Sequence, residues 1–358
     1  MKILKYIILG SLAMVFAVAC QKGIDPISYV APGPDTAAPV VKINYPIEGT
    51  LIRDDAPKVP IKIQVEASDD IELASIAIQL DGTAITSFSS FKDYRRAVEE
   101  YIYDGVSDGE HEMVVTATDL AGKTGSQTVH FQKTTPYHPL YDGEVFYMPF
   151  DGDAMELISN TAATKFGSPT YVAGKIKLAY AGATDAYLTF PTTGLLGSEF
   201  SLAFWYNING TPARGGIFAI ARPYVDYNDT TRYKGLRIFR ENSGTSQNIG
   251  VNLGIGKAEV WISPITTVTE ANFGTWMHIA ISVSGTTANV YINGAVVKTV
   301  ALAGPIDWTD CAPISIASGM PNFTYWDHLS DLSLYDEMRI FNKAITADEV
   351  MQLYSAKK

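Results

Sequence analysis

The fold of this chain is decided by four stretches: FSLAFWYN (Phe200–Asn207), WMHIAISV (Trp276–Val283), NVYINGAVV (289–297) and YDEMRIFNKAI (335–345). The first three alternate apolar with polar residues or are rich in β-branched and aromatic side chains, which is typical of strands. Asn293-Gly294, inside the third stretch, is the two-residue signal for a type I′ hairpin turn. Together the four stretches predict a β-sandwich.

In order and spacing, these stretches resemble the laminin-G-like (concanavalin A-like) jelly roll of many secreted lectin and carbohydrate-binding modules. The resemblance covers about residues 143–354 and includes FYMPFDGD (146–153), which is similar to the family's first strand and turn. It implies an all-β chain in which residues 143–358 form a jelly roll that serves as a scaffold for binding. Such a fold does not by itself imply a reaction.

The N-terminus has the features of a lipoprotein signal peptide, residues 1–19. Lys2 and Lys5 precede an uncharged apolar run over positions 6–19, which is too short to span a bilayer comfortably. The run ends in Ala-Val-Ala and resembles a bacterial lipobox, so Cys20 is expected to become the lipid-modified first residue of the mature protein. An ordinary cleaved secretory signal and an uncleaved membrane helix are the alternatives.

The composition agrees with an extracellular all-β protein of two domains. The mature chain would have 339 residues, 358 minus 19, and the whole chain has 20 tyrosines and only 18% charged residues. Once Cys20 is acylated, Cys311 has no partner for an intrachain disulfide and is expected to be a buried small apolar residue. The net charge of −11 disfavours nucleic acid as a partner.

The N-terminal half is expected to hold a tether and a second sandwich. Residues 20–39 are rich in proline and form the tether. Residues 40–133 contain short strand-like runs separated by turn signals. Within them, 69–80 and 115–123 resemble bacterial immunoglobulin-like domains, which implies a spacer. The charged stretch DYRRAVEEY (93–101) is expected to be a helical turn or an irregular strand.

The jelly roll is expected to follow a Pro-rich linker at residues 134–142. Near its end, Thr346 with Glu349 three residues later predicts a capping box that opens a short terminal helix. Its strands are expected near 145–150, 186–191, 200–207, 215–221, 235–241, 247–254, 276–283, 288–293 and 312–318.

Asp336-Glu337 is the nearest candidate for a pair of catalytic carboxylates. Glycoside hydrolysis needs two carboxyl groups roughly 5 to 10 Å apart across a sugar ring. Jelly-roll glucanases present theirs on one strand face, as in a Glu-x-Asp-x-x-Glu string, which this sequence does not contain. Adjacent residues of a regular strand point to opposite faces, so the pair is not expected to act together and no enzyme activity is expected.

A structural calcium ion is a possible cofactor, since some members of the resembled family hold one between the opening turn and the last strand. Calcium takes carboxylate and carbonyl oxygens, often from turns rich in Asp, Asn and Gly. Asp151 and Asp153 are then the expected ligands, with Asn160 and Asp336 as partners. The alternative is that Asp151-Gly152 is only a tight turn whose carboxylate accepts hydrogen bonds from backbone amides.

Two loops combine aromatic and planar polar side chains, which is the composition that sugar binding needs. In an alternative interpretation these aromatic side chains merely plug one end of the sandwich. The expected glycan-binding residues are Tyr224 and Tyr227 in the first loop, Asn322, Tyr325, Trp326, Asp327 and His328 in the second, and Trp308 beside the second.

Residues 214–240 hold six basic residues against two acidic ones, a local charge of +4 in an acidic protein. Arg side chains match the geometry of carboxylate or sulfate, so the stretch suits an acidic sugar. The interpretation we favour is a solvated strand edge, where Lys and Arg discourage pairing between sheets.

Taken together, the sequence predicts a lipid-anchored, noncatalytic protein of the outer-membrane surface that binds glycan. This arrangement resembles the surface glycan-binding lipoproteins of gut Bacteroidota, which implies that neighbouring glycan-uptake proteins are partners. An adhesion or structural protein that recognises a protein partner is the first alternative. A glycoside hydrolase is the second.

Overall fold

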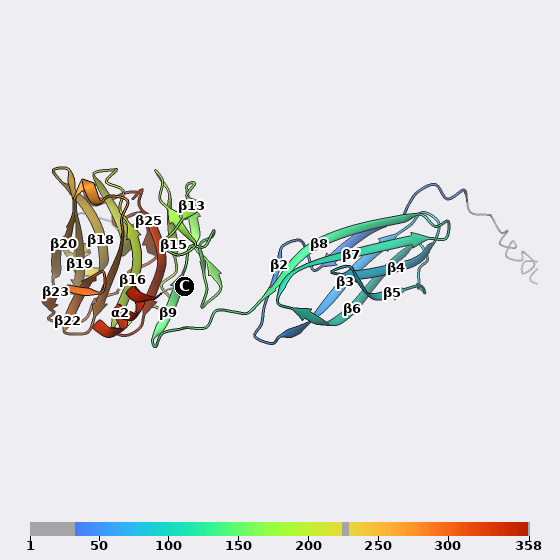
Figure 1. The fold of residues 1–358 in the computed structure, drawn as a ribbon, viewed down its shortest axis with the longest axis horizontal. Helices are drawn as coiled ribbons and strands as arrows, with labels where there is room; N and C mark the ends of the chain where they lie inside the picture. The colour runs from blue at the N-terminus through green and yellow to red at the C-terminus, as the bar shows by residue number, and fades with distance from the viewer. Residues whose placement is uncertain (1–32, 224–228, 357–358) are drawn as a thin grey trace, which may run out of the picture. The chain divides into compact units, whose positions relative to one another are not determined.

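The computed structural model describes residues 33–223 and 229–356, so Tyr224, Tyr227 and Cys20 lie outside the described residues. Nearly all of the regular structure is β, as expected (Figure 1). The chain divides into two compact units between Thr135 and Pro136. Among the helices within the described residues, none is long and apolar enough to cross a membrane.

The N-terminal unit consists of two sheets over one core. Its strands alternate strictly: every second residue of β3 and β7 is buried, and these residues are mostly Val, Ile, Met and Ala. One sheet has the order β1 (Val40–Tyr45), β3 (Lys58–Ser68), β6 (Arg96–Ser107), and the other has the order β2 (Thr50–Arg53), β8 (Thr124–Thr134), β7 (Gly109–Asp119), β4 (Leu73–Leu80), β5 (Thr83–Phe88).

Strand β6 corrects the expectation of a helical turn or irregular strand at residues 93–101. From Arg96 to Tyr103 it pairs in regular antiparallel register with β3, and a register shift separates Tyr103 from the last pairs, at Val106 and Ser107. Its charged side chains lie on the solvent face, where Arg96 contacts Glu66 at 2.7 Å and Glu100 contacts Lys62 at 2.8 Å. The charges that suggested an irregular segment are therefore cross-strand ion pairs of a regular sheet.

The segment expected as a linker, residues 134–142, contributes to both units. Strand β8 runs to Thr134. Beyond it, the Tyr137 hydroxyl donates to Glu144 Oε2 at 2.8 Å, and the Leu140 amide donates to the same oxygen at 2.9 Å. The later part of the segment is therefore held against the start of the C-terminal unit.

The C-terminal unit is built from two large sheets. The first has the order β12 (Thr164–Phe166), β15 (Tyr187–Phe190), β24 (Ile314–Ile316), β17 (Arg214–Ile220), β18 (Lys234–Ser243), β19 (Ser246–Ile255), β20 (Glu259–Val268). The second has the order β13 (Thr170–Ala173), β14 (Leu178–Ala181), β25 (Leu334–Phe341), β16 (Phe200–Asn207), β21 (Trp276–Val283), β22 (Thr287–Ile292), β23 (Ala295–Ala301), with β9 (Glu144–Met148) on β25. A small hairpin joins β10 (Met155–Glu156) and β11 (Thr161–Ala162).

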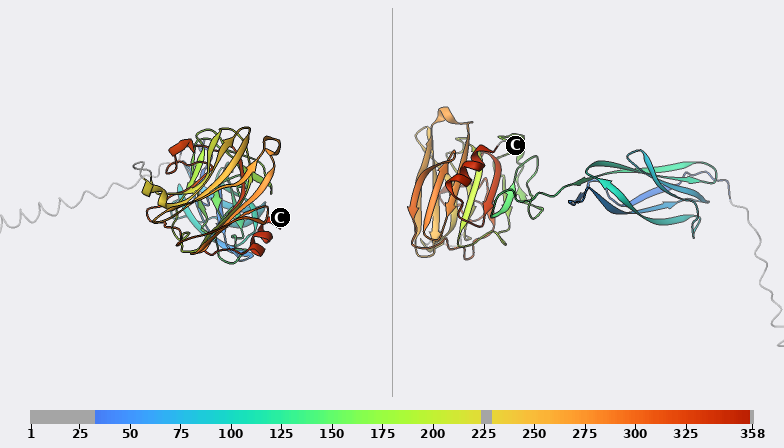
Figure 2. Two further views of the ribbon diagram at one scale, coloured as in Figure 1. Left: turned by 90° about the vertical axis from the view of Figure 1, so that its left-hand side faces the viewer. Right: turned by 60° about the horizontal axis from the view of Figure 1, so that its bottom comes forward.

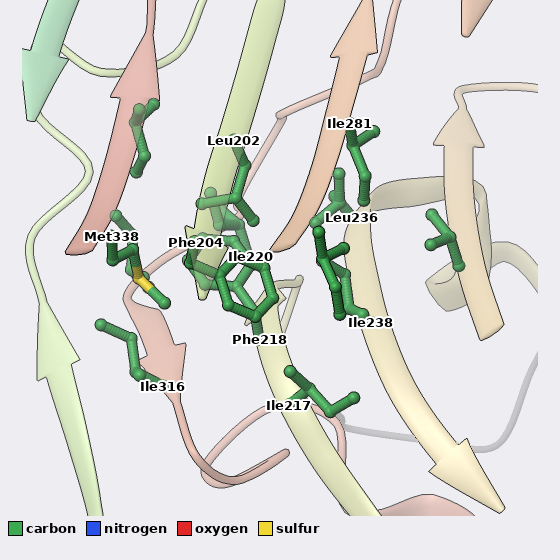
Figure 3. Packing of buried hydrophobic residues seen from close by; sticks show 14 of the residues in the cluster. Leu202, Phe204, Ile217, Phe218, Ile220, Leu236, Ile238, Ile281, Ile316 and Met338 are labelled. Carbon is green, nitrogen blue, oxygen red and sulfur yellow. The ribbon is translucent and has the colours of Figure 1, made fainter. Parts of the chain in front are cut away.

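The core lies between the two large sheets. Figure 3 shows Leu202, Phe204 and Met338 of the second sheet pointing toward Phe218 and Ile238 of the first. All five side chains are fully buried. Burial of this kind contributes roughly 1.5–3 kcal/mol for each large apolar side chain, which stabilises a unit that has no disulfide among its described residues.

The two large sheets differ in what covers their outer faces. Helix α2 (Ala347–Ser355) packs on the outside of the second sheet, where Val350 and Leu353 contact Ala203, Ala280 and neighbouring apolar residues (Figure 2). The predicted capping box is confirmed, because the Thr346 side chain accepts from the Glu349 amide and the Glu349 side chain accepts from the Thr346 amide. In the described part of the chain no α-helix covers the first sheet, and its outer face is partly covered by the 3₁₀ helix η1 (Asp229–Tyr233) and by the loop after β24, which contains the 3₁₀ helix η3 (Tyr325–Asp327).

The hairpin turn predicted at Asn293-Gly294 is confirmed. Asn293 and Gly294 both have positive φ, 51° and 81°, as the predicted type I′ turn requires. The strands between residues 155 and 181, which are β10 to β14, were not expected, and neither was β20. Strand β20 lies at a sheet edge and contains Pro264, a residue that the middle of a sheet does not tolerate.

Candidate functional site

The candidate site lies on the outer face of the first sheet, over strands β18, β19 and β20, where the loop after β24 and residues 229–233 cover part of the strands. Because side chains alternate along a strand, the apolar residues of these strands enter the core and the residues between them face outward. The outward residues that form the site are Arg237 and Phe239 of β18, Asn252 of β19, and Glu259 and Trp261 of β20.

Four aromatic rings are in contact there, the buried Phe239 and the more exposed Trp261, Trp326 and Tyr325. Phe239 lies edge-on to Trp261, with ring centroids 6.1 Å apart. Trp261 lies 6.2 Å from Trp326, which lies 5.2 Å from Tyr325. Trp261 is the outermost ring, with 49% of its surface exposed.

Gly250 makes room for this surface. A Cβ atom at Gly250 would lie 2.9 Å from both Phe239 Cζ and Ser263 Oγ, closer than side-chain carbons normally approach. The end of the Phe239 ring therefore lies over Gly250 of β19, and the ring also packs against Phe323 of the loop after β24. This packing fixes the loop that carries Tyr325 and Trp326.

Glu259 organises the polar part of the site. Its Oε2 accepts a hydrogen bond from Trp261 Nε1 at 2.9 Å, and its Oε1 accepts one from Asn252 Nδ2 at 3.1 Å. The guanidinium groups of Arg237 and Arg232 lie 3.5 Å and 3.4 Å from the same carboxylate. Burial raises the pKa of Glu259, and the two arginines oppose that shift.

The arginines also hold the aromatic residues in place. Arg237, which is fully buried, donates to the Tyr325 hydroxyl at 3.3 Å and to the backbone oxygen of Arg232 at 2.6 Å. The Arg232 guanidinium lies over the Trp326 ring, 5.4 Å from its centroid. The rings are therefore fixed by buried polar contacts rather than free to rotate.

This arrangement suits a flat ligand that has both apolar and hydroxylated faces. The exposed indole of Trp261 offers an apolar plane, and the partly exposed guanidinium group of Arg232 beside it is a planar group that hydrogen-bonds hydroxyl groups. Asn252 is buried and holds Glu259 from beneath, so it supports the site and does not face a ligand.

Tyr325 and Trp326 are the two predicted residues that the structure places in this surface, with the exposed Asp327 next to them. Asn322 and His328 take a different role, because both are buried. Asn322 donates both amide hydrogens to backbone oxygens, at 2.9 Å and 2.7 Å. The His328 ring stacks on Phe323 at 4.6 Å. These two residues position the loop and do not face a ligand.

Trp308 lies apart from this surface, contrary to expectation. Its Nε1 donates to the Gly197 backbone oxygen at 2.9 Å, and its ring packs on Phe200 at 5.1 Å, so it closes the core. Tyr224 and Tyr227 lie outside the described residues. The 3₁₀ helix η1 (Asp229–Tyr233), which follows them in sequence, brings Arg232 to the site.

The interpretation of residues 214–240 as a solvated strand edge is wrong for two of its arginines. Strand β18 lies inside the sheet between β17 and β19, and the side chains of Arg237 and Arg240 are both fully buried. Arg240 pairs with the buried Asp331, and Arg237 lies under Tyr325 and the backbone of Arg232. Sequence analysis also missed Glu259 and Trp261. The signal available was their spacing of two, which places both on one face of a strand.

The four expected calcium ligands are engaged in other contacts or lie in a turn. Asp151 forms an ion pair with Lys177 at 2.9 Å, and Asp153 accepts from the Met155 amide at 2.9 Å. Asn160 is an exposed turn residue with φ of 53°. In the described part of the chain, no three His, Cys, Asp or Glu side chains are grouped to hold a metal ion. Asp336, the fourth expected ligand, has Oδ1 buried without a hydrogen-bond partner among the described residues, and the Asp151 carboxylate contributes to the raised pKa of its side chain. The structural calcium ion therefore stays a prediction.

Asp336 and Glu337 were expected to point to opposite faces of the sheet, and this expectation is wrong. A β-bulge gives β25 one more residue than β16 at this point, and Glu337 has φ of 51°. Tyr335 and Met338, on either side of the pair, both enter the core. The two carboxyl groups therefore share the outer face of the second sheet.

The surroundings of this pair leave little space. Glu337 accepts from the Tyr147 hydroxyl at 2.8 Å and from Arg339 Nη2 at 3.0 Å, while Asp336 Oδ2 accepts from the Ile176 amide at 2.9 Å. The cavity beside Glu337 and Trp205 has a volume of about 10 Å³. That is room for a single water molecule and not for a sugar ring.

Comparison with known proteins places the C-terminal unit in a recognised group of folds. Residues 182–351 match the family model described as the concanavalin A-like lectin/glucanases superfamily. With the two large sheets, this match shows a concanavalin A-like jelly roll in the C-terminal part of the chain. No curated protein matches the sequence.

Three solved structures are similar to parts of this chain. Domain 4 of the extracellular arabinanase AbnA from Geobacillus stearothermophilus, solved with arabinotriose, is 21% identical (TM-score 0.46; 59% of this chain and 98% of that chain covered). The binding domain of botulinum neurotoxin DC, solved with rat synaptotagmin II, is 14% identical (TM-score 0.41; 60% of this chain and 51% of that chain covered). The SAP-like pentraxin of Limulus polyphemus is 16% identical (TM-score 0.33; 44% of this chain and 70% of that chain covered). The chain spans about half of the neurotoxin domain.

Proposed function

We propose that this protein is a noncatalytic glycan-binding protein whose site is the outer face of β18, β19 and β20. The observation that carries the proposal is the exposed Trp261 ring, held by the buried carboxylate of Glu259 beside Trp326 and Arg232. Aromatic planes stack on the apolar faces of sugar rings, and the fixed polar groups around them discriminate between hydroxyl arrangements.

The charge arrangement supports binding rather than hydrolysis at this site. Hydrolysis of a glycosidic bond uses two carboxyl groups in most enzyme families. Glu259 is the one carboxylate in the network described above, and two guanidinium groups and an indole N–H occupy its oxygens. A carboxylate held in this way serves to orient other groups.

The rest of the chain fits a role at the cell surface. In this proposal Cys20 carries the lipid anchor in the outer membrane, residues 20–39 are the tether, and the N-terminal unit is an immunoglobulin-like spacer. The jelly roll then presents its site to glycans, and neighbouring glycan-uptake proteins receive what it captures.

Isothermal titration calorimetry of the chain against a polysaccharide panel tests the proposal. Trp261→Ala should cost about 1–3 kcal/mol, by analogy with aromatic stacking on other flat ligands, and so weaken binding roughly tenfold or more. Phe166→Ala is the matched control. Phe166 is also an exposed ring stacked on an aromatic neighbour, but it lies on β12 at the opposite edge of the same sheet.

Retention of affinity by a folded Trp261→Ala variant would place the glycan site elsewhere. Equal loss in the Phe166→Ala variant would show that the effect is not local. If no glycan binds, recognition of a protein partner becomes the leading function. Release of reducing sugar from a bound polysaccharide would contradict the noncatalytic part of the proposal.

A further inference from the structure

Strand β6 is the longest sheet edge of the N-terminal unit. It spans Arg96–Ser107, whereas the other edge strands, β1, β2 and β5, have six residues or fewer. Within the described residues β6 pairs with β3 alone, so its other side presents unpaired backbone N–H and C=O groups. Such an edge can add a strand from another chain.

The outer face of β6 carries two exposed apolar side chains. Val98 is 52% exposed and Ile102 is 60% exposed. They flank Glu100, whose carboxylate already contacts Lys62 at 2.8 Å and Gln64 at 2.6 Å. Arg96 and Asp104, both exposed, lie at the two ends of this stretch.

The sequence of this face is complementary to itself. If two copies of β6 pair in antiparallel fashion around a twofold axis at Glu100, Arg96 faces Asp104 of the second copy and Val98 faces its Ile102. Each side of the axis then holds one pair of opposite charges and one apolar pair, and both are favourable cross-strand pairs. The two Glu100 side chains keep their ion pairs with Lys62.

Neighbouring registers lack this match. Opposite residues of the two strands must lie on the same face of the sheet, so the pairing can shift only by two residues at a time. The nearest alternative registers therefore have their twofold axis at Glu99 or at Tyr101. At Glu99, Val98 faces Glu100 and Ile102 faces Arg96. At Tyr101, Val98 faces Asp104 and Ile102 faces Glu100. Each shift therefore replaces every favourable pair by an apolar residue against a charge.

We infer that two copies of this chain associate through β6, forming one continuous six-stranded sheet from the two three-stranded sheets of their N-terminal units. This inference goes beyond the proposed function and does not rest on it. A dimer carries two copies of the jelly roll, and two linked sites bind a repetitive ligand more tightly than one.

Disulfide trapping tests the contact directly. In the inferred register a Glu100→Cys variant brings two cysteines face to face across the axis, where opposite Cα atoms lie about 4.5–5.5 Å apart and a disulfide fits. Under mild oxidation the chain from Gln21 to Lys358 should form a cross-linked dimer. Ser87→Cys on β5, another exposed edge position, is the matched control and should remain monomeric.

Charge reversal tests the register. Arg96→Asp and Asp104→Arg should each weaken the dimer about tenfold in sedimentation velocity, since each replaces two attractions by two repulsions. The double variant should regain the wild-type dissociation constant. Circular dichroism checks that each variant is folded.

A monomer at all concentrations, equal cross-linking of Ser87→Cys, or failure of the double variant to recover would each overturn the inference. The glycan titration is independent, because Trp261 lies in the other unit. Loss of the dimer with intact glycan binding, or the reverse, therefore separates the two proposals.

Discussion

Arg240 and Asp331, 91 positions apart in sequence, form a fully buried ion pair with Nε and Oδ1 2.8 Å apart. Asp331 also accepts from the Tyr206 hydroxyl at 2.7 Å and from Ser333 Oγ at 2.8 Å. Arg240 lies on β18 of the first sheet and Tyr206 on β16 of the second. The pair therefore connects the two sheets of the jelly roll through polar contacts inside the core.

Asp331→Asn should destabilise the jelly roll by about 3–5 kcal/mol, because it leaves the Arg240 guanidinium buried without a counter-charge. Urea unfolding followed by tryptophan fluorescence measures this change. Asp142→Asn, which weakens the exposed pair with Lys343 in the same unit, is the control and should cost about 1 kcal/mol or less. Equal costs for the two variants would contradict the role given to burial.

Asp336 should make the stability of the jelly roll fall between about pH 4 and pH 7. Burial raises its pKa from 3.8 to about 7, and the Glu337 and Asp151 carboxylates add to the shift. The folded state then holds a proton that the unfolded state has released. Its stabilising effect is complete below pH 4 and disappears as the pH rises through 7.

Asp336→Asn should remove this part of the pH dependence, since the amide is neutral throughout. Above pH 7 the variant should be more stable than the wild type, by a few kcal/mol at most. Melting temperatures of both proteins from pH 4 to pH 8 measure the difference. Parallel curves for the two proteins would show that Asp336 has an ordinary pKa.

Cys311 should not react with iodoacetamide at pH 8 in the folded protein. Burial raises the pKa of its thiol to about 12, and only 4% of the residue is exposed. The thiolate, which is the reactive form, is therefore scarce and inaccessible. Mass spectrometry before and after addition of urea measures the labelling. Rapid labelling without urea would contradict the buried position.

Cys20 should determine where the protein is found after expression in a host that processes lipoproteins. We expect the wild type in the membrane fraction and Cys20→Ala in the soluble fraction, because acyl chains supply the membrane affinity. Cys311→Ala is the control and should fractionate like the wild type. Membrane association that survives Cys20→Ala would rule out an acyl anchor at this position.

The features that could be predicted from the sequence are those that neighbouring residues decide among themselves. The type I′ turn at Asn293-Gly294 and the capping box of Thr346 and Glu349 depend on a few consecutive residues, and both were predicted correctly. The all-β fold was predicted in the same way, because the alternation or the β-branched and aromatic residues of each stretch indicate a strand without reference to the rest of the chain.

The candidate site was only partly predictable, since its residues come from separate strands and a loop. Tyr325 and Trp326 were expected from the composition of their loop, but nothing local marks Glu259 as the group that holds Trp261 and Arg232. The same composition placed Asn322 and His328 among the ligand-binding residues, although both are buried. Composition identifies an aromatic loop but not which side of it faces the sheet.

The tertiary structure alone decided the pairing of distant residues. The alternation rule put Asp336 and Glu337 on opposite faces, and the bulge against β16 put them on one face. The charges of Arg237 and Arg240 suggested an exposed edge, and the strands and the loop packed around them bury both side chains. Periodicity and turn chemistry act over a few residues and can be read locally, whereas sheet register, burial and ion pairing depend on which strands become neighbours.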